Sequence, residues 1–255
     1  MDKIKIFQEI LKEHRLDFIF RDKMGILTRR KHSDNIEYIL KTNNSCDALP
    51  MMEALNDMIT NSNICIDIGA NIGITSVWLA KNSKKVYAFE PEEKNIIRFR
   101  EQMSLNNIEN VELSEMIVSD SSDIKILHIF ESYGHHSLSP YHVTDKVGEI
   151  QVQSVTLDEF CNNKDIDQID CLKVDVEGFE LEVFHGSKKK LQNKSIKVII
   201  FEHSPVLLRK QNRNIEDVML FLNKYGYRVF TLNHKEINYS DIKDLGQEDL
   251  YAIAK

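Results

Sequence analysis

From residue 63 onward, short apolar runs alternate with segments of helical periodicity, and this alternation restricts the possible folds more than any other feature. Each run has the length of a strand, and most are followed by a turn that contains Gly or Pro. The runs occupy residues 63–68, 85–89, 111–113, 169–175 and 196–203, with further strands expected at 227–232 and near 251–253. Short apolar strands separated by helices are typical of a parallel sheet covered on both faces. The sequence therefore predicts a doubly wound α/β fold of about seven strands, mostly parallel.

The chain before residue 61 follows a different pattern. Apolar spacing predicts a helix over residues 1–14, a hairpin over 16–28 and a second helix over about 47–60. We therefore expect an N-terminal cap or accessory segment at residues 1–60 and the α/β domain at residues 61–255.

The alternation also pauses after Asp120. Strands of alternating polarity are expected at residues 124–130 and 150–155, and the segment between them is rich in Gly, Ser, Pro and His. Because such a polar segment suits a loop carried by a rigid sheet, we interpret residues 131–142 as a mobile loop over the active site.

Charge and cysteine usage narrow the class of protein. The formal net charge of −7 repels polyanions and argues against nucleic acid as a partner. The four cysteines show no C-x-x-C pair, which favours buried thiols in a reducing compartment. The N-terminus lacks the apolar core of a signal peptide, and no run approaches the ~18 apolar residues of a membrane span. A cytoplasmic protein without a membrane span is expected.

The turn after the first apolar run has the strongest functional signal. This turn, between a strand and a helix, contains Asp67, Gly69, Asn71 and Gly73. Its glycines allow close approach of a ligand to the backbone, and the N-terminus of the helix offers free N–H groups. The middle glycine of the dinucleotide fingerprint is missing, which favours a ligand without a pyrophosphate. For Gly73 alone, tight packing of the helix on the strand is an equal alternative.

Two acids end neighbouring strands. Asp67 ends a buried strand, where it is expected either to receive an ammonium group or to bond to the N–H groups of its own turn. Glu90 ends the next strand, close to the ~20-residue offset at which such folds place an acid on ribose hydroxyls. The pair is more specific than either acid alone.

The sequence resembles the FkbM-type methyltransferases. Three blocks carry the resemblance, namely Asp67–Gly73, Ala88–Pro91 and Lys173–Val183, and it covers roughly residues 60–204. It implies a Rossmann-like class I methyltransferase fold that uses S-adenosyl-L-methionine, mostly to methylate hydroxyl groups of sugars and related natural products.

The resemblance also implies roles for individual residues. The turn from Gly69 to Gly73, with Asn71, would cradle the amino-acid part of the cofactor, and Glu90 would accept hydrogen bonds from both ribose hydroxyls. Asp120 lies where related methyltransferases contact the adenine amino group, and an ordinary turn aspartate is an equal alternative.

Asp175 ends the fourth strand, at the crevice where ligands bind in an open parallel sheet. Glu177 follows in the same turn. The two carboxylates are expected near the sulfonium, near a metal or on a substrate hydroxyl, while the alternative for Glu177 is a cap on the following helix.

Methylation of a hydroxyl requires removal of its proton, and histidine is the commonest base near neutral pH. His203 follows the fifth strand and is expected to face the same crevice, so that Asp175 and His203 converge on the hydroxyl with support from Glu177. His135, His136 and His142 lie in the polar loop. A metal held by Asp175 and Glu177 is the rival mechanism.

The sequence thus predicts an O-methyltransferase for a small-molecule or glycan acceptor, as a possible homodimer. A nicotinamide-dependent oxidoreductase on a similar fold is the alternative enzyme, and a catalytically silent binding protein is the alternative from another class. The sequence does not name the methyl acceptor.

Overall fold

A computed structural model describes residues 3–15, 17–31, 48–131, 136–140, 145–238 and 245–255. Its centre is a seven-stranded sheet with the order β11-β12-β10-β9-β3-β4-β5. These strands are β3 (Ser62–Ile68), β4 (Ser83–Phe89), β5 (Val111–Ser114), β9 (Ile169–Val174), β10 (Ile196–His203), β11 (Tyr227–Thr231) and β12 (Glu248–Ala254). β12 runs antiparallel to both neighbours, and the other neighbouring pairs are parallel. The predicted mostly parallel sheet is confirmed.

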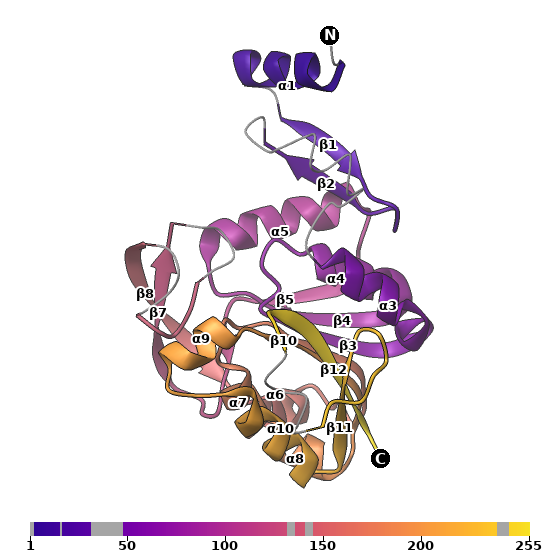
Figure 1. Ribbon diagram of the computed structural model, residues 1–255, viewed down its shortest axis with the longest axis vertical. Coiled ribbons are helices and arrows are strands. Elements are labelled where there is room, and N and C mark those ends of the chain that lie inside the picture. The colour runs from indigo at the N-terminus through magenta and orange to yellow at the C-terminus, as the bar shows by residue number, and fades with distance from the viewer. Residues whose placement is uncertain (1–2, 16, 32–47, 132–135, 141–144, 239–244) are drawn as a thin grey trace.

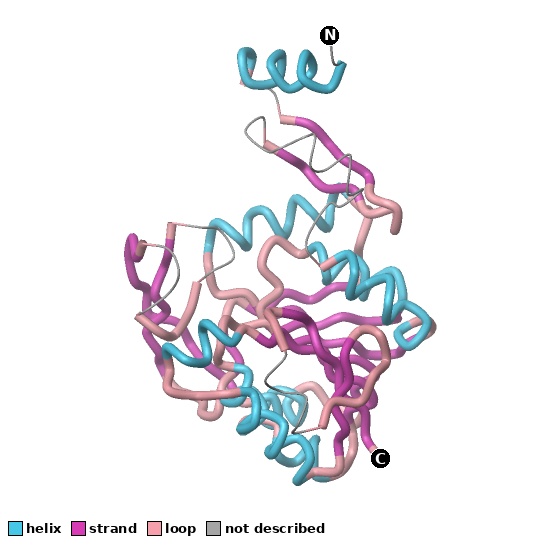
Figure 2. The backbone as a smooth tube through the Cα atoms, in the orientation of Figure 1, coloured by secondary structure: helices cyan, strands magenta, loops and turns pink. Residues whose placement is uncertain are grey.

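Helices cover both faces of this sheet (Figures 1 and 2). One face is covered by α3 (Leu49–Ile59), α4 (Ile74–Asn82) and α5 (Glu93–Leu105). The other is covered by α6 (Leu157–Asn163), α7 (Glu180–His185), α8 (Lys188–Gln192), α9 (Pro205–Lys210) and α10 (Ile215–Lys224). Because side chains alternate along a strand, each central strand contributes to both cores. Cys65 packs towards α3 and α4, for example, and Ile66 towards the opposite helices.

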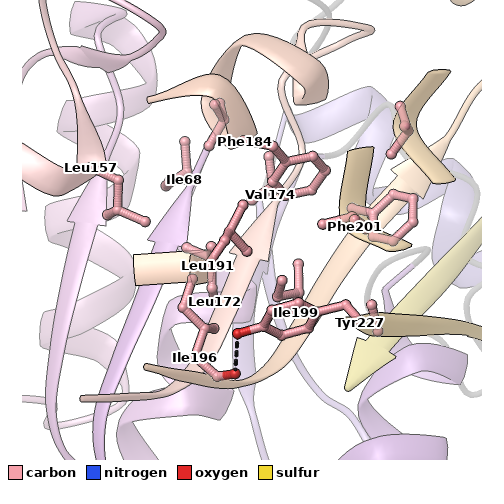
Figure 3. Packing of buried hydrophobic residues seen from close by; sticks show 14 of the residues in the cluster. Ile68, Leu157, Leu172, Val174, Phe184, Leu191, Ile196, Ile199, Phe201 and Tyr227 are labelled. Carbon is pink, nitrogen blue, oxygen red and sulfur yellow. Dashed lines mark hydrogen bonds between the residues drawn. The ribbon is translucent and has the colours of Figure 1, made fainter. Parts of the chain in front are cut away.

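Figure 3 shows the larger of the two cores. Phe184 of α7 meets Phe201 of β10 edge to face, with ring centroids 5.8 Å apart. The buried hydroxyl of Tyr227 donates a hydrogen bond to the carbonyl oxygen of Ile196 at 2.8 Å, so this polar atom is satisfied inside the core.

Two smaller sheets flank the central one. β1 (Phe18–Arg21) and β2 (Leu27–Arg30) form the predicted hairpin, which extends away from the central sheet together with α1 (Lys3–His14) (Figure 1). Asn106, which follows α5, holds the hairpin by hydrogen bonds of 2.8 Å to the backbone N–H and carbonyl of Leu27. β6 (Ile117–Val118), β7 (Ile124–Phe130) and β8 (Lys146–Val155) form a three-stranded sheet after β5.

One local expectation requires correction, because the strand expected at 150–155 begins at Lys146. Lys188 to Lys190 form the start of α8. The carboxylate of Asp158 accepts hydrogen bonds from the N–H groups of Lys189 and Lys190 there, at 2.8 and 3.0 Å.

The described cysteines, Cys65, Cys161 and Cys171, are buried and free. Within the described ranges, no helix has the length and apolar character needed to cross a lipid bilayer.

Candidate active site

A cleft of about 680 Å³ lies at the carboxyl ends of the central strands. Asp175 lines it after β9, Gly69 and Asn71 after β3, Glu90 after β4, and Met116 to Val118 after β5. Because β9, β3, β4 and β5 are consecutive in the sheet, these groups follow one another along its edge. The cleft therefore has a carboxylate-bearing end at Asp175 and an apolar end at Met116 to Val118, where Leu127 also lies.

Glu90 stands between these ends and is 5% exposed. One carboxylate oxygen accepts a hydrogen bond from the backbone N–H of Asn71 at 2.9 Å. The other accepts from the N–H of Glu92 at 3.0 Å and from the side-chain amide of Asn95 at 3.2 Å. Burial raises the pKa of Glu90, and these hydrogen bonds oppose the rise. Glu90 thus connects the turn after β3 (residues 69–73, the β3 turn) to the start of α5.

Two polar atoms of this cleft are buried without a partner in the described part of the chain. They are the side-chain oxygens of Asn71 and Asn95, and both residues line the cleft. Buried polar atoms in folded proteins are nearly always hydrogen-bonded, so an unpartnered pair beside Glu90 points to a ligand that brings donors.

The two glycines of the β3 turn serve the packing of the protein itself. A Cβ atom on Gly69, whose φ is +76°, would stand 1.8 Å from the carbonyl oxygen of Asp175. A Cβ atom on Gly73 would stand 2.7 Å from the ring of Phe99 on α5. Gly69 is therefore required because the turns after β3 and β9 approach each other closely. Gly73 is required because the start of α4 packs on α5, and not on a strand.

Lys173 is the residue that the sequence reasoning missed. It is 6% exposed, and its ammonium lies 3.3 Å from carboxylate oxygens of both Asp67 and Asp175. It also donates to the carbonyl oxygen of Gly69 at 3.0 Å. The two carboxylates raise the pKa of Lys173 against the effect of burial, so the ammonium stays charged. A lysine within the run 169–174, which is apolar apart from it and Asp170, was the available signal.

Asp67 is fully buried and does not line the cleft. Its second oxygen accepts a hydrogen bond from the hydroxyl of Ser76 on α4 at 2.6 Å. Within the described residues, Lys173 and Ser76 contact the carboxylate, and no N–H group of its own turn bonds to it. A cofactor-binding role for Asp67 stays a prediction.

Asp175 and Glu177 both line the carboxylate-bearing end of the cleft. The side chain of Asp175 is 41% exposed there. The partial burial of this carboxyl raises the pKa of Asp175, and the ammonium of Lys173 opposes the rise. Glu177 adopts a left-handed conformation with φ +55°, and its carbonyl oxygen accepts a hydrogen bond from Ser137 at 3.2 Å.

The prediction that His203 converges with Asp175 is wrong. His203 follows Ile199 and Phe201 on the face of β10 that packs against α9 and α10, and it is 3% exposed. It does not line the cleft, and burial lowers its pKa. Strand alternation is the cause, because it turns Glu202, not His203, towards the face that holds Lys173 and Asp175.

Asp120 also lies outside the cleft lining. Its side chain is 48% exposed, accepts hydrogen bonds from Ser119 and Ser121, and lies 3.6 Å from the ammonium of Lys125. The structure matches the alternative of an ordinary turn aspartate, and Val118 is the nearby residue that lines the cleft.

Of the polar loop, only residues 136–140 and Glu131 are described, so the expected mobile lid over 131–142 lies partly outside the described residues, as do His135 and His142. His136, Ser137 and Leu138 line the cleft. Ser137 pairs with His128 of β7, which ties this part of the loop to the small sheet.

No group of three metal-ligand side chains occurs within the ranges that the structure describes. Asp175, one of the two expected ligands of the rival metal mechanism, is paired with Lys173.

The sheet order with one antiparallel strand, together with a cleft at the carboxyl edge of β9, β3, β4 and β5, defines the class I methyltransferase fold. The family model of the Methyltransferase FkbM domain matches residues 67–229. The chain belongs to this family, as the three sequence blocks indicated.

Individual curated proteins are similar to this chain at less than 30% identity. Hexuronic acid methyltransferase AglP of Haloferax volcanii is 29% identical over 136 residues, which are 53% of this chain and 54% of that protein. 2-O-methyltransferase NoeI of Sinorhizobium fredii is 26% identical over 144 residues, 50% of this chain and 58% of that protein. The matches thus span little more than half the length of these relatives.

Among solved structures, methyltransferase FkbM of Methylobacillus flagellatus is similar with a TM-score of 0.48 and 15% identity, over 75% of this chain and 43% of that one. At this level of similarity the family assignment rests on the sequence match.

Proposed function

We propose that this protein is an S-adenosylmethionine-dependent O-methyltransferase that acts on a hydroxyl of a sugar or glycan. The observation that supports it best is the cleft in which Glu90 is flanked by the unpartnered oxygens of Asn71 and Asn95. Membership of the methyltransferase family supports the reaction class, and we propose the cleft as its site.

The cleft residues fit the parts of S-adenosylmethionine in order. The apolar end at Met116, Val118 and Leu127 suits the adenine ring. Glu90 accepts three hydrogen bonds from the protein, which leaves about one of its roughly four carboxylate lone pairs for a ribose hydroxyl. Asn71 and the carboxylate-bearing end suit the amino-acid part and the cationic sulfur. Bound there, the cofactor supplies an electrophilic methyl group. The protein positions it, and positioning is a large part of the rate enhancement of such transfers.

The names of two relatives together support a sugar hydroxyl as the acceptor. One is a hexuronic acid methyltransferase and the other a 2-O-methyltransferase. We extend the acceptor class, a sugar hydroxyl, to this chain, but not the particular sugar.

We also propose residues 1–60 as an accessory segment and 61–255 as the methyltransferase domain. The hairpin β1–β2 forms a separate sheet, and the central sheet starts at Ser62, which supports this division. The homodimer and the cytoplasmic location stay predictions.

Glu90→Ala is expected to weaken binding of S-adenosylhomocysteine about 10- to 100-fold, because charge-assisted hydrogen bonds contribute ~1.5–3 kcal/mol. Isothermal titration calorimetry measures this directly. Glu93→Ala is the matched control, since Glu93 is exposed at the start of α5, the helix that follows Glu90. Equal affinities of Glu90→Ala and the unmodified protein are incompatible with ribose recognition by Glu90.

The activity itself is tested with methyl-labelled S-adenosylmethionine and a panel of neutral sugars and uronic acids as methyl glycosides. We expect labelled methyl ether on at least one sugar by mass spectrometry, and none with Glu90→Ala at a cofactor concentration that leaves the variant unloaded. In parallel, S-adenosylhomocysteine should raise the melting temperature and NADH should not. The opposite ranking favours the oxidoreductase alternative.

A further inference from the structure

Four charged side chains share one face of the sheet at its carboxyl edge. Asp67 of β3 pairs in register with Lys173 of β9, and Val174 pairs with Phe201 of β10. The next residues, Asp175 and Glu202, are therefore neighbours at the level where the two strands end. Val198 and Ile200, which alternate with Glu202 along β10, belong to the core beneath α3 and α4, the same side as Asp67.

Glu202 lies one strand beyond the cleft that fits the cofactor. That cleft ends at Asp175 and Glu177, and Glu202 is not part of its lining. In the proposed binding order, the adenosine occupies the end at Val118 and Glu90, so the reacting methyl belongs at the end near Asp175. The methyl acceptor must approach this end from outside the cofactor cleft, which is where Glu202 lies.

The electrostatic surroundings of Asp175 and Glu202 differ. Lys173 pairs with Asp175 at 3.3 Å and stabilises its charged form. Within the described ranges, no Lys or Arg forms an ion pair with Glu202, and its one hydrogen bond there is from the side-chain amide of Gln247 to Oε1 at 2.9 Å. Burial and the nearby carboxylates of Asp175, Glu177 and Glu180 raise the pKa of Glu202 to about 8.

We propose that Glu202 is the general base that takes the proton from the acceptor hydroxyl, an inference that rests on the proposed function. As the hydroxyl oxygen forms its bond to the methyl carbon, the bond from sulfur to that carbon breaks and its electron pair stays on sulfur. The hydroxyl proton moves to a carboxylate oxygen of Glu202. The positive charge of the sulfonium and the negative charge of Glu202 disappear together, so the step is balanced.

Other candidates fit this role less well. The ammonium of Lys173, shared with Asp67, stabilises the charged form of Asp175, whereas within the described residues no Lys or Arg pairs with Glu202, so Asp175 is the weaker base of the two. Glu180 is 3% exposed and accepts hydrogen bonds from the N–H groups of Val176 and Gly178, so it fixes the turn. His203 is on the opposite face of β10.

The kinetic test compares Glu202→Gln with the unmodified protein on the best sugar of the panel. Loss of a general base costs ~10²–10⁴ in rate, so kcat should fall by that order. Affinity for S-adenosylhomocysteine should change less than about twofold. Glu248→Gln is the matched control, because Glu248 lies on β12 opposite His203 and therefore on the other face. A fall of less than threefold in Glu202→Gln overturns the proposal while the proposed function stands.

The second test needs no methyl acceptor. Carbon NMR of protein labelled at the glutamate carboxyls, with S-adenosylhomocysteine bound, follows the titration of Glu202, and Glu202→Gln identifies its signal. We expect a midpoint near pH 8, because burial and the nearby carboxylates raise the pKa of Glu202 to about 8. The charged groups on the same side as Glu202 are Lys173 of β9, Asp175 and Glu177 from the turn after β9, Glu180 of α7 and Asp249 of β12. A midpoint in the ordinary glutamate range overturns the assignment.

Gln247→Leu adds a readout that a purely structural role would not produce. The amide of Gln247 stabilises the charged carboxylate, so its removal should move the Glu202 midpoint, and the rising limb of the pH–rate profile with it, to higher pH. A shift of the midpoint without a shift of the rate profile excludes Glu202 as the base. If none of the sugars is methylated but Glu202 titrates near pH 8, the proposed sugar acceptor is wrong, while the assignment of Glu202 as a carboxylate of raised pKa stands.

Discussion

Lys173→Met is expected to lower the free energy of unfolding by about 3–5 kcal/mol, the usual cost of leaving a buried charge without its partner. Asp67 is fully buried, and Lys173 is its only cation within the described chain. Removal of the ammonium also frees the carbonyl oxygen of Gly69, so the β3 turn should loosen and cofactor affinity should fall with stability.

Urea denaturation measures the loss, and Lys85→Met on β4 of the same sheet is its control. Lys85 pairs with Glu112 at 3.1 Å, but both side chains are more than one third exposed, so the expected change is at most ~1 kcal/mol. Equal losses in the two variants would show that the buried network contributes no more than a surface pair.

The Lys173→Met deficit should depend on pH. Lys173 lowers the pKa of Asp175, which burial raises. Without the ammonium, this pKa rises further above that of the unfolded chain, and the folded variant holds a proton that the unfolded chain releases. Its stability is therefore lost as pH rises through the carboxyl range, and the gap to the unmodified protein is largest at neutral pH. A gap that widens as pH falls would contradict this account.

Gly69→Ala is expected to cost at least ~3 kcal/mol and to abolish measurable cofactor binding. The added Cβ would stand 1.8 Å from the carbonyl oxygen of Asp175, which is backbone and cannot rotate away. Alanine also pays about 1–2 kcal/mol for the left-handed conformation at φ +76°. The turns after β3 and β9 must separate, and both line the cleft.

Thermal unfolding and calorimetry with S-adenosylhomocysteine measure the two effects. Gly148→Ala is the control, because no atom lies within 4 Å of its Cβ position and its φ is not left-handed. It should change stability by less than ~1 kcal/mol. If Gly69→Ala binds S-adenosylhomocysteine normally, close approach of the two turns is not what the glycine provides.

Many residues that line the cleft could be predicted, because the sequence pattern shows where each strand ends. Asn71, Glu90, Asp175 and Glu177 all line the cleft, and each was found from a turn that follows an apolar run. The placement of His203 could not be predicted in this way, because the apolar run shows where the strand ends but not which of its two faces each residue is on. At the end of a strand, a shift of one residue reverses the face, and the sequence does not say which face is open.

The sequence by itself determined the α/β class, the positions of the central strands and the family, because these depend on local periodicity and on short contiguous blocks. The tertiary structure alone decided which partners meet across strands. Lys173 joins Asp67 to Asp175, Glu202 comes to lie beside Asp175, and Gly69 makes room for a distant carbonyl. These contacts are set by strand order and register between residues far apart in the chain, and the energy of a buried charge depends on its neighbours in space rather than in sequence.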